Sequence, residues 1–192
     1  MMIHLHHLNS ADIDKRGKLS HEPRWLRQER VKAWEKYKNS PEPDWRRSKM
    51  PKLDEKNLIR LDSPRKVVSS VHPKPIVSRD RSGEIVIQDG KLKSLSLPAE
   101  LAYQGVILCD MQTALLERAD LLERFIARST WGIDDRYTAL HRALWGNGFF
   151  LFIPKDLRLE HPFQLSMIQS KPESSMFSRN VIILDERAHA IV

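Results

Sequence analysis

The feature that most constrains the fold of this chain is a series of short apolar runs between Ala139 and Val192. Pro, Gly or charged residues interrupt the runs and leave strand-length segments at 149–153, 164–168, 181–184 and 188–192. Strands of this length and spacing are typical of a β-solenoid or a β-sandwich, although no exact internal repeat is present. The last run is unfinished at Val192, and an edge strand without a partner exposes unpaired backbone groups. We therefore expect the opening part of a larger β architecture, truncated early.

The net charge of +7 is concentrated in the N-terminal part of the 192 residues. Residues 1–80 hold 19 Lys/Arg and 11 Asp/Glu, a balance of +8, whereas residues 81–192 hold 13 and 14, a balance of −1. Acidic residues are interspersed among the cations between Arg24 and Lys56, which favours a solvated helix surface or an acidic protein partner over nucleic acid. A basic adaptor or nucleic-acid-binding protein that acts through the N-terminal helical region stays open as the alternative.

The sequence also bounds the compartment in which the protein is expected to work. No segment approaches the roughly 18 uninterrupted apolar residues of a membrane span, and the N-terminus lacks the basic and apolar regions of a secretory signal. Cys109 is the only cysteine, so no internal disulfide can form, as is usual in a reducing compartment. We expect a cytoplasmic protein without a membrane partner.

The chain divides into five segments by composition and periodicity. We expect a polar flexible tail (1–20), a helical N-terminal region (21–62), a linker (63–82), a mixed α/β segment (83–146) and the start of a β core (147–192). Pro23 suits the first turn of a helix, and the closely spaced Pro41 and Pro43 end it. The apolar face of that helix comprises Leu26, Ala33 and Tyr37, with Trp34 beside it.

The mixed segment is predicted to contain a hairpin, a further strand and two helices. Glu84–Gln88 and the residues after Asp89-Gly90 form the hairpin, and residues 105–110 form the next strand. Thr113 is a plausible N-cap for a helix over 114–128, whose apolar stripe comprises Leu115, Ala119, Leu122 and Ile126. Asp134-Asp135 is expected to cap a second helix that ends at Gly146.

No residue pattern predicts catalysis or a metal site. Cys109 lies in an apolar strand, where a thiol packs as a small hydrophobe, and one thiol cannot assemble an iron site. His4, His6 and His7 lie in the expected tail, and His141, His161 and His189 are scattered over the chain. We therefore predict a non-enzymatic protein with no catalytic residue and no metal ligand; residues that would bind a cofactor cannot be named.

Other polar motifs are better explained by structure than by chemistry. Gly146-x-Gly148 precedes a strand and lacks the helix N-terminus that holds a phosphate. The serine pairs Ser69-Ser70 and Ser174-Ser175 have no His and Asp in catalytic order, and Glu123, Asp134 and Asp135 suit helix surfaces and caps. Trp25, Trp34 and Trp45 are expected to anchor helix packing rather than to stack on bases.

Several of these elements together resemble the SufB/SufD family. The N-terminal elements are Glu22-Pro23-Arg24-Trp25-Leu26 with Lys32-Ala33-Trp34-Glu35, followed by Asp44-Trp45-Arg46-Arg47. Gly105-Val106-Ile107 with Asp110 then leads into a helix. The most specific part begins with a helix at Ala139-Leu140, which is followed by a glycine, an apolar strand and Pro-Lys over residues 148–155. Leu159-Glu160, Pro162 and residues 178–183 then continue the pattern. The order and spacing of these elements, over roughly residues 20–192, carry the resemblance, which is nearer SufD than SufB.

The resemblance implies a fold and a function. The fold is α+β: an N-terminal helical region followed by the first rungs of a right-handed parallel β-helix, truncated in this chain. The function is that of a non-enzymatic, SufD-like scaffold subunit of the SUF iron–sulfur cluster assembly complex. The implied partners are a SufB-like paralogue and a SufC-like ABC ATPase. The family handles iron–sulfur clusters transiently, and this segment is expected to bind no cofactor itself, because no cluster ligand of the family has a counterpart here.

Overall fold

The structure is a computed structural model, and it describes residues 3–4, 7–44, 60–61, 80–126, 135–170 and 175–192. The chain forms two compact units, each built from separate stretches of sequence. Unit 1 comprises residues 1–67, 115–145 and 171–177, and unit 2 comprises residues 68–114, 146–170 and 178–192. The described part is mixed α/β with mixed sheets, so the predicted combination of helices and strands is confirmed at that level.

Unit 1 is built on three helices, α1 (Ser10–Leu19), α2 (Arg24–Asn39) and α6 (Arg136–Leu144). The predicted apolar face of α2 is confirmed, because Leu26, Ala33, Trp34 and Tyr37 are all buried. Four of α6's residues, Ala139, Leu140, Ala143 and Leu144, pack into the same core as Trp34 and Tyr37. A two-residue pair of antiparallel strands, β1 (Ile3–His4) and β2 (Arg60–Leu61), also belongs to this unit, as do the helical residues between 115 and 126.

Helix α1 corrects the expectation of a flexible tail over residues 1–20. Asn9 caps it, since its side chain accepts a hydrogen bond from the Asp12 backbone N–H and Asp12 in turn accepts one from the Asn9 N–H. This reciprocal arrangement satisfies two of the helix's otherwise unpaired donors. Ile13 is buried against the core, which fixes the helix to α2 despite its polar composition.

The helices after residue 110 differ from the prediction in two ways. Instead of one helix over 114–128, α4 (Met111–Glu117) and α5 (Ala119–Ile126) are separated at Arg118, whose carbonyl accepts from the Leu122 N–H and starts α5. Thr113 is not the cap: the Asp110 carboxylate accepts from the backbone N–H groups of Gln112 and Thr113, so α4 begins earlier. For α6, Asp135 is the N-cap as predicted and accepts from the Thr138 N–H.

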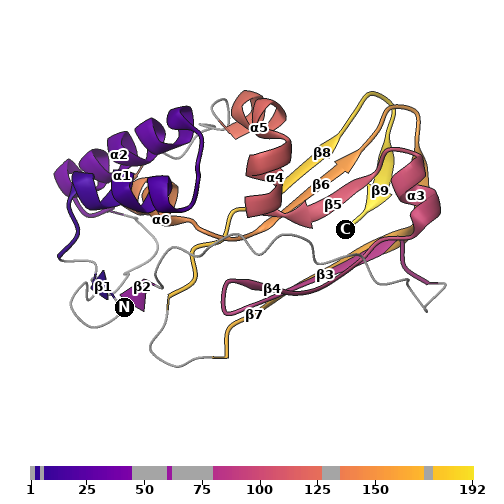
Figure 1. Cartoon of the computed structure of the whole chain (residues 1–192), viewed down its shortest axis with the longest axis horizontal. Coiled ribbons are helices and arrows are strands. Elements are labelled where there is room, and N and C mark those ends of the chain that lie inside the picture. The colour runs from indigo at the N-terminus through magenta and orange to yellow at the C-terminus, as the bar shows by residue number, and fades with distance from the viewer. Residues whose placement is uncertain (1–2, 5–6, 45–59, 62–79, 127–134, 171–174) are drawn as a thin grey trace. The chain divides into compact units, whose positions relative to one another are not determined.

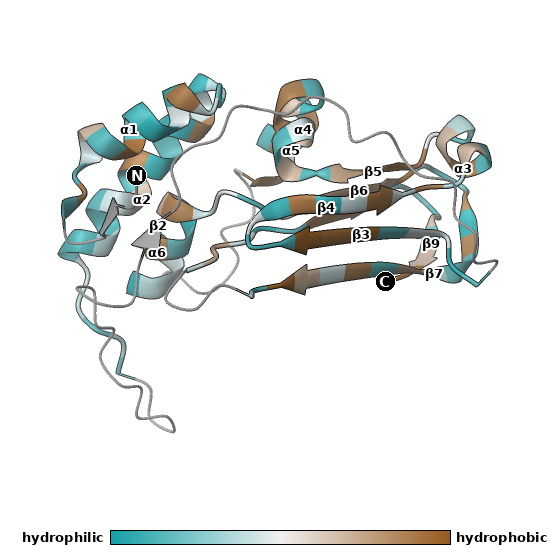
Figure 2. Cartoon of the chain, turned by 60° about the horizontal axis from the view of Figure 1, so that its bottom comes forward, coloured by the Kyte–Doolittle hydropathy of each residue, from teal (hydrophilic) through white to brown (hydrophobic). Residues whose placement is uncertain are grey.

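Unit 2 consists of two mixed sheets with an apolar core between them (Figures 1 and 2). One sheet has the order β4-β3-β7-β9 and the other β5-β6-β8. The strands are β3 (Gly83–Gln88), β4 (Lys91–Ser96), β5 (Ile107–Asp110), β6 (Phe149–Ile153), β7 (Arg158–Ile168), β8 (Val181–Leu184) and β9 (His189–Ile191). A short helix, α3 (Ala99–Tyr103), connects β4 to β5.

The pairing confirms the predicted hairpin and strands of unit 2. β3 and β4 pair in antiparallel around Asp89-Gly90, both of which have positive φ. β5 pairs with β6 in antiparallel, whereas β3–β7, β6–β8 and β7–β9 are parallel. β7 is longer than the predicted strand over 164–168, because its residues from Arg158 onward pair with β9 and its later residues pair with β3.

Candidate functional site

The chemical candidates in the sequence do not converge in the structure. Among the residues that the structure describes, no group of three or more His, Cys, Asp or Glu is placed to hold a metal ion. Cys109 is half-buried in β5, opposite Phe150 of β6. His7, His161 and His189 are exposed, and His141 lies half-buried in α6. His6, Asp134, the Ser69-Ser70 pair and Ser174 lie outside the described residues, as does the His4 side chain.

The buried polar centre of unit 1 is built around Arg30. Its guanidinium donates to both carboxylate oxygens of Glu22 at 2.8 Å, donates to the Ala143 carbonyl at 3.3 Å, and lies 4.2 Å from the centre of the Trp145 ring. All of these contacts lie inside the helical core and none faces an open site. The arrangement joins the α1–α2 connection to the end of α6, so its role is structural.

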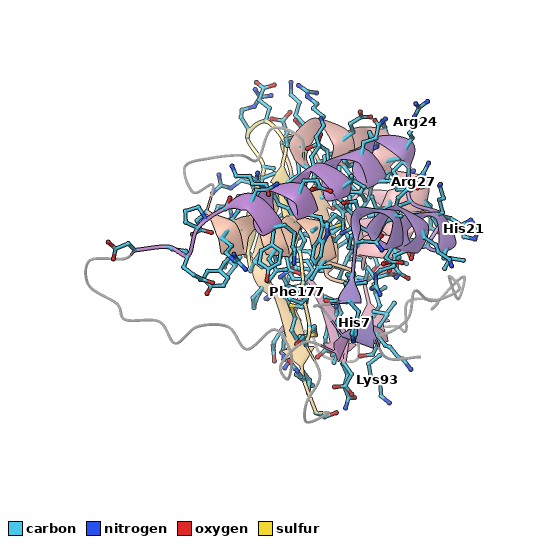
Figure 3. All side chains as sticks on the ribbon, turned by 90° about the vertical axis from the view of Figure 1, so that its left-hand side faces the viewer. His7, His21, Arg24, Arg27, Lys93 and Phe177 are labelled. Atoms are coloured by element: carbon cyan, nitrogen blue, oxygen red, sulfur yellow. The ribbon has the colours of Figure 1, made fainter. Side chains whose placement is uncertain are left out.

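Over the described residues 7–44 the basic surplus of the N-terminal part is small. Residues 7–44 hold nine Lys/Arg and seven Asp/Glu, a balance of only +2, whereas residues 45–79 hold ten and three, a balance of +7. His21 and Arg24 are exposed where α1 connects to α2, but Arg27 nearby donates to Asp14 at 2.9 Å (Figure 3). Trp34 is buried and packs on Tyr37 rather than facing solvent, as predicted, and Trp45 lies outside the described residues.

The distinctive construction of this molecule is in unit 2, where two strand–corner–strand segments stack on each other. We call residues 147–159 repeat 1 and residues 178–190 repeat 2. Phe150 to Ile153 pair in parallel with Val181 to Leu184, and Arg158 pairs with His189. These paired residues are 31 positions apart in the sequence. A hydrogen bond between the repeats has the same spacing, because the Phe149 N–H donates to Asn180 Oδ1. Each repeat therefore contributes one strand to each sheet.

The repeats also stack closely at the turn that precedes β6. Asn147 forms a parallel bridge with Ser178, whose hydroxyl donates to the Asn147 side chain. Gly148 has φ of 137°, and a Cβ on it would lie 1.8 Å from the Arg179 carbonyl oxygen. Glycine is therefore required here for backbone approach, and Gly146-x-Gly148 is a stacking element rather than a phosphate loop, as its position before a strand predicted.

Oppositely charged side chains align at the corner between the two strands of each repeat. Lys155 Nζ lies 2.8 Å from Glu186 Oε2, and Arg187 Nη2 lies 2.9 Å from Asp156 Oδ2. The order of charge is basic then acidic in repeat 1 and acidic then basic in repeat 2. Asp156 and Arg187 both have positive φ, and the Asp156 N–H donates to the Glu186 carbonyl, so the two corners have matching backbone shapes. We call these two ion pairs the corner ladder.

The core-facing side chains of repeat 2 are much more exposed than those of repeat 1. Leu151 and Ile153 are fully buried at 0%, whereas Ile182 and Leu184, their register partners in β8, are 41% and 46% exposed. Paired residues of neighbouring parallel strands point to the same side of a sheet, so these side chains face the same core. The apolar core of unit 2 is thus uncovered at repeat 2 in the described structure.

Among the residues that the structure describes, no helix is both long and apolar enough to cross a membrane.

Part of the stacked unit matches a known family model. Residues 77–165 match the family model described as the SufBD protein N-terminal region. This range contains β3 to β6 and most of β7, and therefore repeat 1 together with β3 and β5, but not β8 and β9 of repeat 2.

Curated relatives match along most of the chain. It is 26% identical to the iron-sulfur cluster assembly SufBD family protein ABCI8, chloroplastic, of Arabidopsis thaliana, over 93% of this chain and 35% of that protein. It is 27% identical to the iron-sulfur cluster assembly protein SufD of Bacillus subtilis (87% of this chain, 40% of that protein). It is 24% identical to the iron-sulfur cluster assembly protein SufB of the same organism, over 94% of this chain and 42% of that protein.

The chain spans about two fifths of the length of these curated relatives. Its resemblance to the family, carried in the sequence by the order of elements between residues 20 and 192, is confirmed by both kinds of match. This chain is similar to SufB/SufD family proteins along most of its length and corresponds to part of these longer relatives.

Proposed function

We propose that this chain acts in iron–sulfur cluster assembly as a scaffold subunit. The observation that carries the proposal is the match of residues 77–165 to the SufBD N-terminal region, on the segment that contains the first stacked repeat. The relatives named for iron–sulfur cluster assembly, which match most of this chain, support the same role. The Bacillus SufD is 27% identical and SufB 24%, which favours the SufD type.

The proposed scaffold is the start of a right-handed parallel β-helix. Two repeats that stack in parallel at a separation of 31 residues support this fold, because each turn of a β-helix adds one strand to each of its sheets. In this role the chain supplies shape and a binding surface, and chemistry on the cluster is left to other polypeptides. The iron–sulfur cluster is then cargo of the assembly, and this segment holds no cofactor of its own.

The proposed partners are a SufB-like paralogue and a SufC-like ATPase, in the cytoplasm. An assembly scaffold works by bringing proteins together, so partner binding is the property that the proposal predicts first. The alternative of a nucleic-acid-binding adaptor draws little support from residues 7–44, whose nine Lys/Arg are offset by seven Asp/Glu. Such a protein would need clustered, unpaired cations on one face.

Affinity purification from a cell that contains a complete SUF system tests the proposal. The tagged full-length chain is expressed in place of the host's SufD-type protein, and the eluate is examined for the SufB-type protein, the ATPase, iron and acid-labile sulfide. We expect both proteins to co-elute in fixed proportion and growth under iron limitation to be at least partly restored. A folded chain, verified by its melting transition, that retains neither protein and restores no growth would contradict the proposal.

A further inference from the structure

The second strand of the hairpin in unit 2 carries one residue more than the first strand can match. Leu92 of β4 lies opposite Ile87 of β3. The next pair joins Ser94 to Val86, so Lys93 between them has no opposite residue and forms a β-bulge. Of the described strands in its sheet, β4 is the last on one side, with β3 and then β7 beside it (Figure 2). The bulge therefore lies in an edge strand.

We propose that the bulge at Lys93 keeps the outer edge of β4 from pairing with β4 of a second copy of this chain. An edge strand offers backbone N–H and C=O groups to any strand that can align with it. Two identical edge strands can pair in antiparallel about a twofold axis. An extra residue disrupts the regular row of donors and acceptors that such pairing needs. The proposal does not depend on the iron–sulfur role.

The core of unit 2 does not need the extra residue. Leu92 and Leu95 both pack into this core, where they lie opposite the buried Ile87 and Ile85. Successive side chains of a regular strand point to opposite faces, so two leucines three positions apart share one face only because the bulge lies between them. Without Lys93 they would be two positions apart, which is the spacing that a regular strand requires. A strand one residue shorter would therefore place the same side chains in the core.

The identity of the extra residue also suits an unpaired edge. Lys93 and Lys91 are both exposed, and they are the only lysines between Lys74 and Lys155. Lysine is one of the residues with which proteins protect exposed strand edges. Antiparallel pairing of two β4 strands would bring two copies of each charge to the same interface, and like charges on neighbouring strands repel. Shape and charge at this edge thus act in the same direction.

The test compares the full-length chain with a variant from which Lys93 is deleted. Two control variants keep the bulge: Lys93→Thr removes the charge of the extra residue, and Lys91→Thr removes an equal charge from the same strand. Melting curves establish that each chain folds. Amide hydrogen exchange of β4 is then measured by NMR at low and at high protein concentration. The N–H groups that face away from β3 report pairing at this edge, whereas association elsewhere on the molecule does not bond to them.

We expect the deletion variant to fold and to melt no lower than the wild-type chain, because its core pattern is intact. Its outward N–H groups in β4 should exchange at least about 10-fold more slowly at high than at low concentration, as pairing between two copies protects them. In the wild-type chain and in both threonine variants, the same groups should exchange fast at both concentrations.

Four results would overturn the proposal. Exchange that is independent of concentration in the folded deletion variant would show that the bulge does not control pairing. Slow exchange of the outward β4 groups in the wild-type chain would show that this edge is already covered. Protection at high concentration in a threonine variant would assign the effect to charge instead of the bulge. A deletion variant that fails to fold would show that the extra residue serves packing within unit 2.

Discussion

The guanidinium of Arg30 and the carboxylate of Glu22 form a bidentate ion pair in which both N–O distances are 2.8 Å. Their side chains are only 5% and 11% exposed, so the pair is shielded from solvent. Removal of one partner leaves an uncompensated buried charge, which typically costs about 3–5 kcal/mol. The pair therefore fixes the α1–α2 connection against α6 with a much larger energy than the exposed pairs of the same helices.

Arg30→Met is expected to lower the free energy of unfolding by about 3 kcal/mol, because Glu22 would remain buried without its partner. Urea denaturation followed by circular dichroism measures this change. Lys32→Met is the control: Lys32 pairs with Glu29 at 3.0 Å, but both side chains are largely exposed, and a loss below about 0.5 kcal/mol is expected. Similar losses for the two variants would contradict a special role for the buried pair.

Asp110→Ala is expected to destabilise the protein by about 1 kcal/mol, because the backbone N–H groups of Gln112 and Thr113 lose their acceptor. Thr113→Ala should cost less, since the Thr113 hydroxyl only donates to Asp110 and caps no helix. Chemical denaturation of both variants gives the comparison. A larger effect at Thr113 would restore the cap that the sequence predicted and would reject Asp110.

Sequence reasoning located elements better than it located the contacts between them. The strand at 149–153, the hairpin and the Asp135 cap follow from local patterns and were predicted correctly. Helix α1 was missed because its polar composition concealed the Asn9–Asp12 capping box, which is visible in the sequence at the right spacing. The break at Arg118 was missed because the apolar stripe continues across it in the sequence, although α4 ends at Glu117 and α5 begins at Ala119.

The stacking of repeats 1 and 2 could not be found by a search for internal similarity. At the corner the two repeats are complementary rather than alike, since Lys155 and Asp156 face Glu186 and Arg187. Before β6, Gly148 lies against the backbone of Arg179, and these two residues differ greatly in side-chain size. The stacking of the repeats follows from these contacts, whereas the predicted absence of a catalytic constellation came from residue types alone and stays a prediction.

Leu151→Ala and Ile182→Ala test whether the core of unit 2 is uncovered at repeat 2. Both residues occupy paired positions of neighbouring strands, yet Leu151 is buried and Ile182 is not. Truncation of a buried Leu typically costs about 2–5 kcal/mol, and we expect about 1 kcal/mol or less at Ile182. Denaturant midpoints of the monomeric chain provide the values, and equal losses would show that Ile182 is covered.

Acid unfolding should depend on Asp14 in α1. The hydrogen bond from Lys18, which lies 2.6 Å away, is the main cause that lowers the pKa of the Asp14 carboxyl, and the charge of Arg27 acts in the same direction. A lowered pKa in the folded state stabilises the protein above the ordinary value of 3.8, and this contribution disappears as the pH falls through the folded-state pKa. Asp14→Asn should flatten the stability profile below about pH 4, whereas Asp44→Asn, at an exposed position outside α1, serves as the comparison. If Asp14→Asn left the pH dependence of the free energy of unfolding unchanged at acid pH, the role given to Asp14 would be contradicted.

Amide hydrogen exchange along β8, measured by NMR on the isolated monomeric chain, tests the central claim most directly. The Asp185 and His189 N–H groups donate to the Ile153 and Leu157 carbonyls of repeat 1, so both should exchange slowly. Alternate residues of an edge strand point their N–H groups outward, so the N–H groups of Ile182 and Leu184 should exchange fast. Uniform slow exchange throughout β8 in the free chain would show neighbours on both sides and would contradict the open, stacked edge.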